Sequence, residues 1–235
     1  MTLPIAILAG GMATRIRPVT ERIPKALVEV AGEPFAFHQL RLLARSGIER
    51  VVYLLGHLGE QVEEVVGDGS RFGLQVEYCF DGPRLLGTAG AVARACPLLG
   101  EQFFVLYGDS YLECDYRAAE GAFLASGQPA LMTVFANFGR WDSSNVEFHG
   151  NRIIAYDKRV PSARMTHIDY GLGAFSAAVF AGVSREHPSD LSVLYQQLAA
   201  GGQLAAFEVF QRFYEVGSFA GIEELTRHLS AESRS

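Results

Sequence analysis

Buried-strand patterns alternate with helical patterns along the first half of the chain, and this alternation restricts the possible folds more than any other feature. Short apolar runs occupy residues 4–8, 50–56, 74–80 and 102–109, and helical patterns fill most of the segments between them. Parallel neighbouring strands need a long crossover, which a helix usually supplies. The first half therefore predicts a Rossmann-like α/β fold, with a mixed, mostly parallel sheet flanked by helices.

From about residue 130 the pattern changes to strands with little helix between them. Strand patterns occupy residues 130–136, 145–158, 169–175 and 204–216, and helical patterns occupy residues 190–202 and 219–229. The His149–Arg152 stretch, HGNR, is typical of a tight hairpin turn. No linker-like segment or internal repeat separates the two halves. We therefore expect a single domain over residues 1–235.

The composition excludes several classes of protein. The formal net charge is −6, which argues against broad nucleic-acid binding because that function needs a basic face. The three cysteines are widely spaced and form no CxxC pair, so they predict neither a disulfide framework nor a zinc site. The apolar run at residues 5–9 is too short for a signal peptide or a membrane span. These features predict a cytoplasmic protein with no membrane partner.

Two glycines, Gly10 and Gly11, follow the first strand directly. In open α/β sheets the ligand binds beyond the carboxyl ends of the strands, and glycines there allow the backbone to approach it closely. Arg15, Arg17 and Lys25 add positive charge of the kind that a polyphosphate requires. Neither the GxGxxG fingerprint nor the P-loop is present. A tight turn without a ligand, with solvated surface cations, is the alternative interpretation.

The segment GGMATRIRPVTERIPKALVEVAG, residues 10–32, resembles the signature of the sugar-1-phosphate nucleotidyltransferases, or NDP-sugar pyrophosphorylases. That signature is GGxGTRxxPxTxxxPKxxxxV, and Ala13 stands where the family has glycine. LLGTAGA at 85–91 and LYGDSYL at 106–112 resemble two further motifs of the family. The resemblance covers nearly the whole chain and is greatest to the short bacterial members that use heptose 1-phosphate or N-acetylmuramate 1-phosphate.

The resemblance implies Mg²⁺-dependent transfer of a nucleotidyl group from an NTP to a sugar 1-phosphate, giving an NDP-sugar and pyrophosphate. GTP with D-glycero-D-manno-heptose 1-phosphate is the first expectation. The alternatives are a UTP- or dTTP-using transferase for hexose or amino-sugar 1-phosphates, a cytidylyltransferase for a non-sugar substrate, and a non-catalytic nucleotide-sugar-binding regulator. The expected partners are the two substrates, and the expected state is a monomer or homodimer.

The family pattern also implies roles for individual residues and for the two halves. Residues 1–130 would bind the nucleotide, and residues 131–235 would bind the sugar. Predicted nucleotide-binding residues are Leu8, Ala9, Gly10, Gly11, Thr14, Arg15, Gly87, Thr88, Gly108 and Asp109. Predicted catalytic residues are Arg15, Lys25, Asp109 and Lys158. These residues would neutralise and orient the phosphates, because a direct in-line displacement needs no covalent nucleophile.

The sugar and metal residues depart from the family pattern in places. Lys158, in AYDKR, resembles the family's Glu-Lys pair, and we expect it to hold the sugar phosphate unless it is only a salt-bridged surface lysine. Asp169, Tyr170 and Gly171 are predicted to line the sugar site, with Asp169 standing where an amide is common. Asp109 follows a buried strand and is predicted to bind Mg²⁺, with a turn cap as the alternative. Glu215, in place of the family's aspartate, is the predicted second metal ligand.

Overall fold

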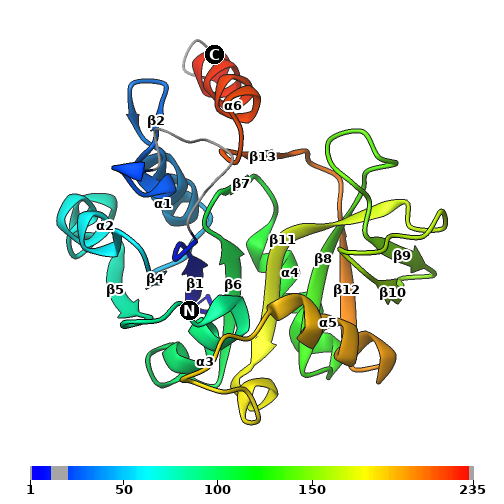
Figure 1. The fold of residues 1–235 in the computed structure, drawn as a ribbon. Coiled ribbons are helices and arrows are strands. Elements are labelled where there is room, and N and C mark those ends of the chain that lie inside the picture. Colours follow the sequence, from blue (N-terminus) through cyan, green and yellow to red (C-terminus); the bar gives the residue numbers. More distant parts are fainter. Residues whose placement is uncertain (1, 12–20, 233–235) are drawn as a thin grey trace.

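The structure is a computed structural model that describes residues 2–11 and 21–232. Its centre is a nine-stranded sheet with the order β5-β4-β1-β6-β11-β8-β12-β10-β9 (Figure 1). The strands are β1 (Ile5–Leu8), β4 (Arg50–Leu55), β5 (Gln75–Phe80), β6 (Gln102–Tyr107), β8 (Ala130–Ala136), β9 (Val146–His149), β10 (Arg152–Tyr156), β11 (His167–Ser176) and β12 (Leu204–Val209). One sheet therefore contains strands from both halves of the chain.

Two pairs of short strands lie outside this sheet. They are β2 (Glu29–Val30) with β3 (Glu33–Pro34), and β7 (Ser110–Leu112) with β13 (Phe213–Glu215). The helices are α1 (Phe35–Arg45), α2 (Gly59–Val66), α3 (Gly87–Leu99), α4 (Tyr116–Ser126), α5 (Leu191–Ala200) and α6 (Phe219–Glu232). None of the helices in the described part of the chain combines the length and the apolar character needed to cross a bilayer.

The two faces of the sheet carry separate hydrophobic cores. On β1, Ile5 and Ile7 point to the face covered by α1, α2 and α4, whereas Ala6 points to the face covered by α3 and α5. Side chains alternate between faces along a strand, so a strand covered on both sides must be apolar at every position. This requirement explains why the first half reads as continuous apolar runs.

The strand pairing confirms a mixed sheet flanked by helices. Strands β5, β4, β1 and β6 are parallel to one another, as are β8 and β12. Strand β11 runs antiparallel to both β6 and β8, and β10 runs antiparallel to β12 and β9. Four of the eight neighbouring pairs are therefore antiparallel. The first half is parallel as predicted. In the second half, β9 and β10 form a hairpin, whereas the other three antiparallel pairs join strands that are distant in the sequence.

Helix α4 was not predicted from the sequence. Its sequence, YRAAEGAFLAS, contains a glycine at 121 and lies just before the strand-rich half. Asp115 caps the helix by accepting a hydrogen bond from the Ala118 amide at 2.9 Å. The buried side chains of Tyr116, Ala119 and Phe123 attach it to the sheet. Tertiary packing, more than helix propensity, therefore stabilises this helix.

Candidate active site

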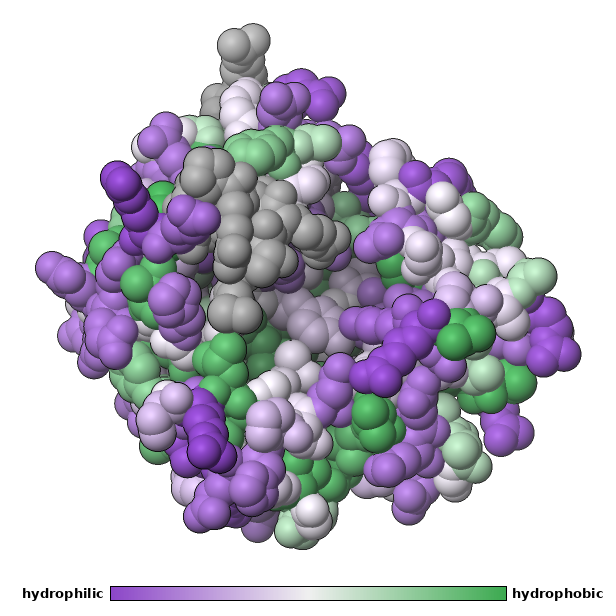
Figure 2. Space-filling model, viewed as in Figure 1, coloured by the Kyte–Doolittle hydropathy of each residue, from purple (hydrophilic) through white to green (hydrophobic). Residues whose placement is uncertain are grey.

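A cleft lies at the carboxyl ends of β1, β4 and β6. It contains a cavity of about 190 Å³ and a neighbouring cavity of about 120 Å³. Leu8, Gly11 and Asp109 line both cavities. Figure 2 shows that the face of the molecule seen in Figure 1 is hollowed near its centre. The position agrees with the rule that ligands of open α/β sheets bind beyond the strand ends.

Glycines at the floor of the cleft allow strand ends to approach one another. A Cβ atom on Gly10 would lie 3.1 Å from the Gly56 nitrogen, and one on Gly56 would lie 2.7 Å from the Gly10 carbonyl oxygen. A Cβ on Gly108 would lie 2.4 Å from the Leu8 carbonyl oxygen, which accepts the Gly108 amide at 3.0 Å. Gly11 lines both cavities, and among the described residues no atom lies within 4 Å of a Cβ added to it.

Replacing Gly108 by alanine should lower the free energy of unfolding by about 2–3 kcal/mol, because the new methyl group meets backbone that cannot move aside. Gly121→Ala is the matched control: Gly121 lies inside α4 with open space around it. That change should raise the free energy of unfolding by about 0.5–1 kcal/mol. Urea unfolding measures both, and equal effects of the two changes would contradict the close approach at Gly108.

Each of the eight described residues of the predicted nucleotide-binding set lines at least one of the two cavities. They are Leu8, Ala9, Gly10, Gly11, Gly87, Thr88, Gly108 and Asp109. Thr14 and Arg15 lie outside the described residues. The structure thus brings together segments that are far apart in the sequence, from β1, β6 and the start of α3. Their roles in binding remain predictions.

The start of α3 is occupied by the chain itself. The carbonyl oxygen of Ser189 accepts the amides of Ala89 at 2.9 Å and of Gly90 at 3.4 Å, and the Thr88 hydroxyl accepts the Leu191 amide at 2.7 Å. Gly87 has φ +67°, and a Cβ there would lie 2.5 Å from the Ser189 oxygen. Because the amides of Ala89 and Gly90 already donate to Ser189, we do not expect them to bind a phosphate. We expect Gly87 and Thr88 to contact the nucleotide along the cavity wall.

Lys25 and Asp109 form an ion pair of 2.8 Å between Nζ and Oδ2 in the cleft. Lys25 opens a 3-10 turn, Lys25–Leu27, directly after Pro24, and its side chain is 19% exposed. Pro24 has an extended backbone before the turn, with φ −66° and ψ 151°, and its ring restricts φ to this value. The Pro-Lys pair of the sequence thus places an ammonium group where Asp109 meets both cavities.

The backbone of β13 runs beside Asp109. The Val216 amide donates to the Asp109 carbonyl oxygen at 2.9 Å, and Glu215 pairs in register with Ser110. Within residues 2–11 and 21–232, no cluster of three or more His, Cys, Asp or Glu side chains could hold a metal. Two carboxylates with substrate phosphates are nevertheless the usual ligand set of Mg²⁺. Asp109 and Glu215 therefore fit the predicted metal in type and in backbone position.

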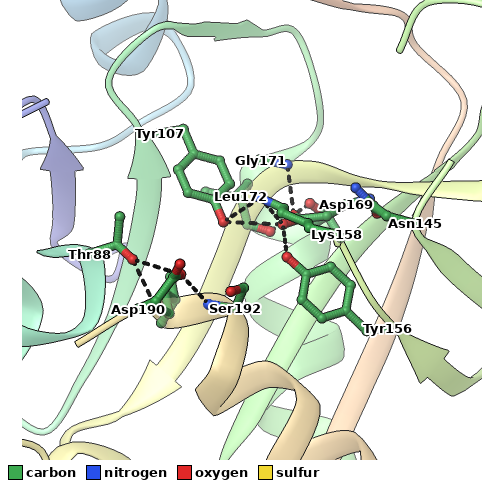
Figure 3. Close-up of polar contacts among 12 residues, drawn as sticks. Thr88, Tyr107, Asn145, Tyr156, Lys158, Asp169, Gly171, Leu172, Asp190 and Ser192 are labelled. Carbon is green, nitrogen blue, oxygen red and sulfur yellow. Dashed lines mark hydrogen bonds and ion pairs between the residues drawn. The ribbon is translucent and has the colours of Figure 1, made fainter. Parts of the chain in front are cut away.

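Lys158 lies in a compact polar cluster with Asp169, Tyr107 and Tyr156. Figure 3 shows these side chains pointing toward one another from β6, β10, the segment after β10, and β11. Lys158 Nζ lies 3.1 Å from the Tyr107 hydroxyl and 3.4 Å from Asp169 Oδ2. The hydroxyls of Tyr107 and Tyr156 donate to the same Oδ2 at 3.2 and 3.3 Å. Lys158 is thus anchored at the edge of the cleft.

The structure corrects the role expected of Asp169. Its side chain is only 1% exposed, and Oδ1 accepts the Gly171 amide at 3.1 Å while Oδ2 faces Lys158 and two tyrosine hydroxyls. Three donors share Oδ2 and one amide donates to Oδ1, so most of the acceptor capacity of this buried carboxylate is used within the protein. Asp169 therefore serves as a counter-charge for Lys158 instead of accepting two sugar hydroxyls.

The Tyr170 side chain does not line the cleft as predicted. It points to the opposite face of β11 from Asp169, is 2% exposed, and packs against Phe135 and Phe213. Alternation along the strand explains this placement. Gly171 returns to the cleft side with φ +104°, and a Cβ there would lie 3.3 Å from both the Ser110 hydroxyl oxygen and the Tyr107 ring. Of Tyr170 and Gly171, only Gly171 lies on the side of β11 that faces the predicted sugar site.

Three residues in or next to the cleft were not identified from the sequence. Asp81 directly follows β5 and lines the larger cavity, and the strand-end argument used for Asp109 would have identified it. Tyr107, the last residue of β6, also lines that cavity. Asp190 caps α5 by accepting the Ser192 amide, and it accepts the Thr88 hydroxyl at 3.4 Å. Nothing in the sequence links Asp190 to Thr88, because 102 residues separate them.

Burial and hydrogen bonding shift two of these carboxyl groups in opposite directions. Burial raises the pKa of Asp81, and the Leu86 amide and Arg94 only partly offset it. Burial also acts to raise the pKa of Asp190, but the hydrogen bonds from Ser192 and Thr88 and the charge of Lys158 outweigh it, so this pKa is lowered. Asp81, next to Leu85, is therefore a partly desolvated carboxyl group, whereas the charged form of Asp190 is stabilised by its hydrogen bonds and by Lys158.

Comparison with known proteins agrees with this geometry. The family model described as Nucleotidyl transferase matches residues 5–143. The chain belongs to the nucleotidyl transferase family. It is 41% identical over 114 residues to an N-acetylmuramate alpha-1-phosphate uridylyltransferase of Neisseria meningitidis, a match covering 48% of this chain and 49% of that protein. It is 29% identical over 231 residues to a glucose-1-phosphate thymidylyltransferase of Streptomyces antibioticus, covering 94% of this chain and 64% of the relative.

The chain thus spans about half to two-thirds of these two relatives. Solved structures confirm the nucleotidyl transferase fold. HddC of Yersinia pseudotuberculosis, solved with GMP-PN, superposes with a TM-score of 0.78 at 21% identity, covering 97% of this chain and 100% of that one. A UDP-glucose pyrophosphorylase of Acinetobacter baumannii gives a TM-score of 0.79 at 18% identity, covering 99% and 94%. The predicted family and the predicted fold class are both confirmed.

Proposed function

We propose that this member of the nucleotidyl transferase family is a sugar-1-phosphate nucleotidyltransferase. The observation that carries the proposal is the placement of its two lysines, Lys25 and Lys158, among 20 Lys and Arg residues. Lys25 pairs with Asp109 and Lys158 contacts Tyr107, and these two partners line the same cavity. All the other residues in this set of 20 are arginine. The two lysines stand at the two places where a compact ammonium group faces the cleft.

The two lysines suit a reaction between two phosphorylated anions. In the proposed reaction an oxygen of the sugar phosphate attacks the α-phosphorus of the NTP, a new P–O bond forms, and pyrophosphate leaves with the electrons of the broken bond. Lys25 would hold the nucleotide phosphates and Lys158 the sugar phosphate. Asp109 and Glu215 would hold Mg²⁺, which supplies further neutralisation of phosphate charge. Arg15 is proposed as a further phosphate contact on the basis of the sequence alone.

We propose one nucleotidyltransferase domain, with the nucleotide bound by residues 1–130 and the sugar phosphate by residues 131–235. The distribution of the two lysine clusters supports this division, because Lys25 and Asp109 lie in the first part and Lys158 and Asp169 in the second. A sheet shared by both parts would hold the two clusters at a fixed separation. A monomer or homodimer is the proposed state.

For the nucleotide we propose GTP, on the basis of Asp81. Asp81 lines the larger cavity together with the apolar residues Leu8, Leu54 and Leu85. Guanine presents two adjacent donors, N1–H and N2–H₂, to which a carboxylate is complementary. Uracil and thymine place carbonyl oxygens beside their single N–H, and a carboxylate would repel them. D-glycero-D-manno-heptose 1-phosphate is the proposed sugar, supported by the sequence resemblance.

A pyrophosphate-release screen tests the proposed function. Purified protein with Mg²⁺ would receive each of five NTPs, combined in turn with heptose, hexose and amino-sugar 1-phosphates. Release with one pair, dependent on both substrates, is the expected result, with GTP and a heptose 1-phosphate as the preferred pair. Nucleotide binding in a thermal-shift assay without release from any pair would favour a non-catalytic regulator.

Asp81→Asn should reduce kcat/KM for GTP about 10- to 100-fold. One of the two guanine N–H donors would then face the amide nitrogen of asparagine, another donor, instead of a charged carboxylate oxygen. The rate with UTP should change far less. The asparagine oxygen can still accept the Leu86 amide, which Asp81 Oδ2 accepts at 3.0 Å, so the loop should stay in place. Competition between GTP and UTP measures the preference. Equal losses for both nucleotides would contradict base recognition by Asp81.

A further inference from the structure

The Tyr107 hydroxyl connects the nucleotide cavity with the Lys158 cluster. Tyr107 is the last residue of β6, and its side chain lines the cavity that Asp109 and Thr88 also line. Its hydroxyl accepts a hydrogen bond from Lys158 Nζ at 3.1 Å and donates to Asp169 Oδ2 at 3.2 Å. Figure 3 shows Tyr107 between the Thr88–Asp190 pair and the cluster around Asp169. One side chain therefore touches both proposed substrate regions.

Lys158 depends on these contacts for its position. Its side chain is 39% exposed and follows β10 in a segment without regular structure. A lysine side chain has many rotamers, and holding it in one of them requires several simultaneous contacts. Here the Tyr107 ring lies 4.5 Å from Nζ, the Tyr107 hydroxyl lies 3.1 Å away, and Asp169 lies 3.4 Å away. Two of the three contacts come from Tyr107.

We propose that Tyr107 is a positioning residue that fixes the Lys158 ammonium beside the nucleotide cavity before the sugar phosphate binds. Asp169 supplies the opposite charge. The hydrogen bond from Lys158 Nζ to the Tyr107 hydroxyl fixes the direction from which the ammonium approaches Asp169. This inference rests on the proposed function where it assigns the sugar phosphate to Lys158. A cation held in place before binding loses less freedom when the substrate arrives, so it favours both binding and reaction.

The hydrogen bonds of Tyr107 agree with this role. Its hydroxyl donates to Asp169 Oδ2 at 3.2 Å and accepts from Lys158 Nζ at 3.1 Å, so one group uses both its donor and an acceptor position within the cluster. A tyrosine that only filled space would need no hydroxyl at this point.

Tyr156 provides a matched control within the same cluster. Its hydroxyl donates to the same Asp169 Oδ2 at 3.3 Å, and its ring is buried against Tyr195. Lys158, by contrast, contacts Tyr107, through both the hydroxyl and the ring of that tyrosine. Tyr107→Phe and Tyr156→Phe thus each remove one hydrogen bond to Asp169. The Tyr107 change also removes the hydroxyl from Lys158 while keeping the ring in the cavity.

Steady-state kinetics with both substrates is the first readout. Tyr107→Phe should raise KM for the sugar 1-phosphate and lower kcat, so that kcat/KM for this substrate falls about tenfold. KM for the NTP should stay within about twofold, because the ring remains. Tyr156→Phe should change each constant less than about threefold, although thermal unfolding midpoints should fall similarly in both variants. Equal kinetic effects of the two changes would overturn the proposal.

Amine labelling is the second readout and does not depend on turnover. The chain has two lysines, so acetylation by N-hydroxysuccinimidyl acetate reports on Lys25, Lys158 and the α-amino group alone. Mass spectrometry after timed labelling should show Lys158 reacting several-fold faster in Tyr107→Phe than in the unmodified sequence. Lys25 should react at the same rate in both, and Tyr156→Phe should leave both rates unchanged.

The two readouts separate failure of this inference from failure of the proposed function. If the unmodified protein releases no pyrophosphate with any substrate pair, the proposed function fails, and faster labelling of Lys158 in Tyr107→Phe would still support positioning by Tyr107. Unchanged labelling of Lys158 in that variant would overturn the inference, whatever the activity. Faster labelling with unchanged kcat and KM would also overturn it, because the position of Lys158 would then have no effect on the reaction.

Discussion

Lys25→Met is expected to lower kcat/KM about 100- to 1,000-fold, because one fixed positive group near the reacting phosphates is lost. The Nζ atom lies 2.8 Å from Asp109 Oδ2 in the cleft, so its removal also leaves that carboxylate without its cation. The pair is about one-fifth exposed, and the free energy of unfolding should fall by only ~1 kcal/mol. Pyrophosphate release and urea unfolding on the same preparation measure both quantities. A large loss of activity with a small loss of stability is the expected combination.

Two further variants identify the source of the effect. Arg152→Met removes an exposed cation on β10 and should leave the rate near that of the unmodified protein. Lys25→Arg keeps the charge but introduces a larger planar group into the cavity, so it should restore only part of the rate. Near-normal turnover by Lys25→Met would show that this residue does not act on the phosphates.

Asp109→Asn is expected to lower kcat by about 100- to 1,000-fold at fixed Mg²⁺, through loss of both the metal carboxylate and the partner of Lys25. The Mg²⁺ concentration at half-maximal rate should also rise by more than about tenfold, because a neutral amide binds a hard cation more weakly. Titration of Mn²⁺ followed by electron paramagnetic resonance measures metal binding without turnover. An unchanged metal requirement would contradict Asp109 as a ligand.

Glu215→Gln separates the two predicted metal ligands. Glu215 pairs with Ser110 across β13 and β7, next to Asp109, so we expect this change to weaken metal binding in the same direction. Glu186→Gln, at an exposed position of the loop before α5, is the control for loss of one negative charge. If Glu215→Gln and Glu186→Gln behave alike while Asp109→Asn loses metal, Glu215 is not a ligand.

Much of the fold could be predicted because its elements have strong local signals. Helix α3 (Gly87–Leu99) lies between the apolar runs at 74–80 and 102–109, in a segment of the kind for which a helical pattern was predicted. Helix α1 ends at Arg45, and Gly47 follows it with φ +84°, a conformation that commonly terminates helices at glycine. The order of strands in the sheet had no such signal, because β11 lies between β6 and β8 only through contacts distant in sequence.

The proposed nucleotide part of the candidate site was easier to predict from the sequence than the proposed sugar part. Residues at strand ends and glycine turns that were predicted to bind the nucleotide, such as Gly10 and Asp109, line one cleft, because sheet topology alone brings them together. Their binding role stays a prediction. Asp169 and Tyr170 were assigned by pattern, and the pattern did not show which face of β11 each side chain would take. Tyr107 was missed because a tyrosine at the end of an apolar strand is equally typical of the core.

The sequence by itself determined the family, the α/β fold class and the cations of the cleft, since these depend on local periodicity and on residue types at short spacing. Only the tertiary structure decided how the cations are held. Lys25 and Asp109 are 84 residues apart, and Tyr107 and Asp169 are 62 apart, yet each pair lies within hydrogen-bonding distance. A side chain acquires such a partner only when the sheet order and the facing of each strand are set, and both result from packing across the whole chain.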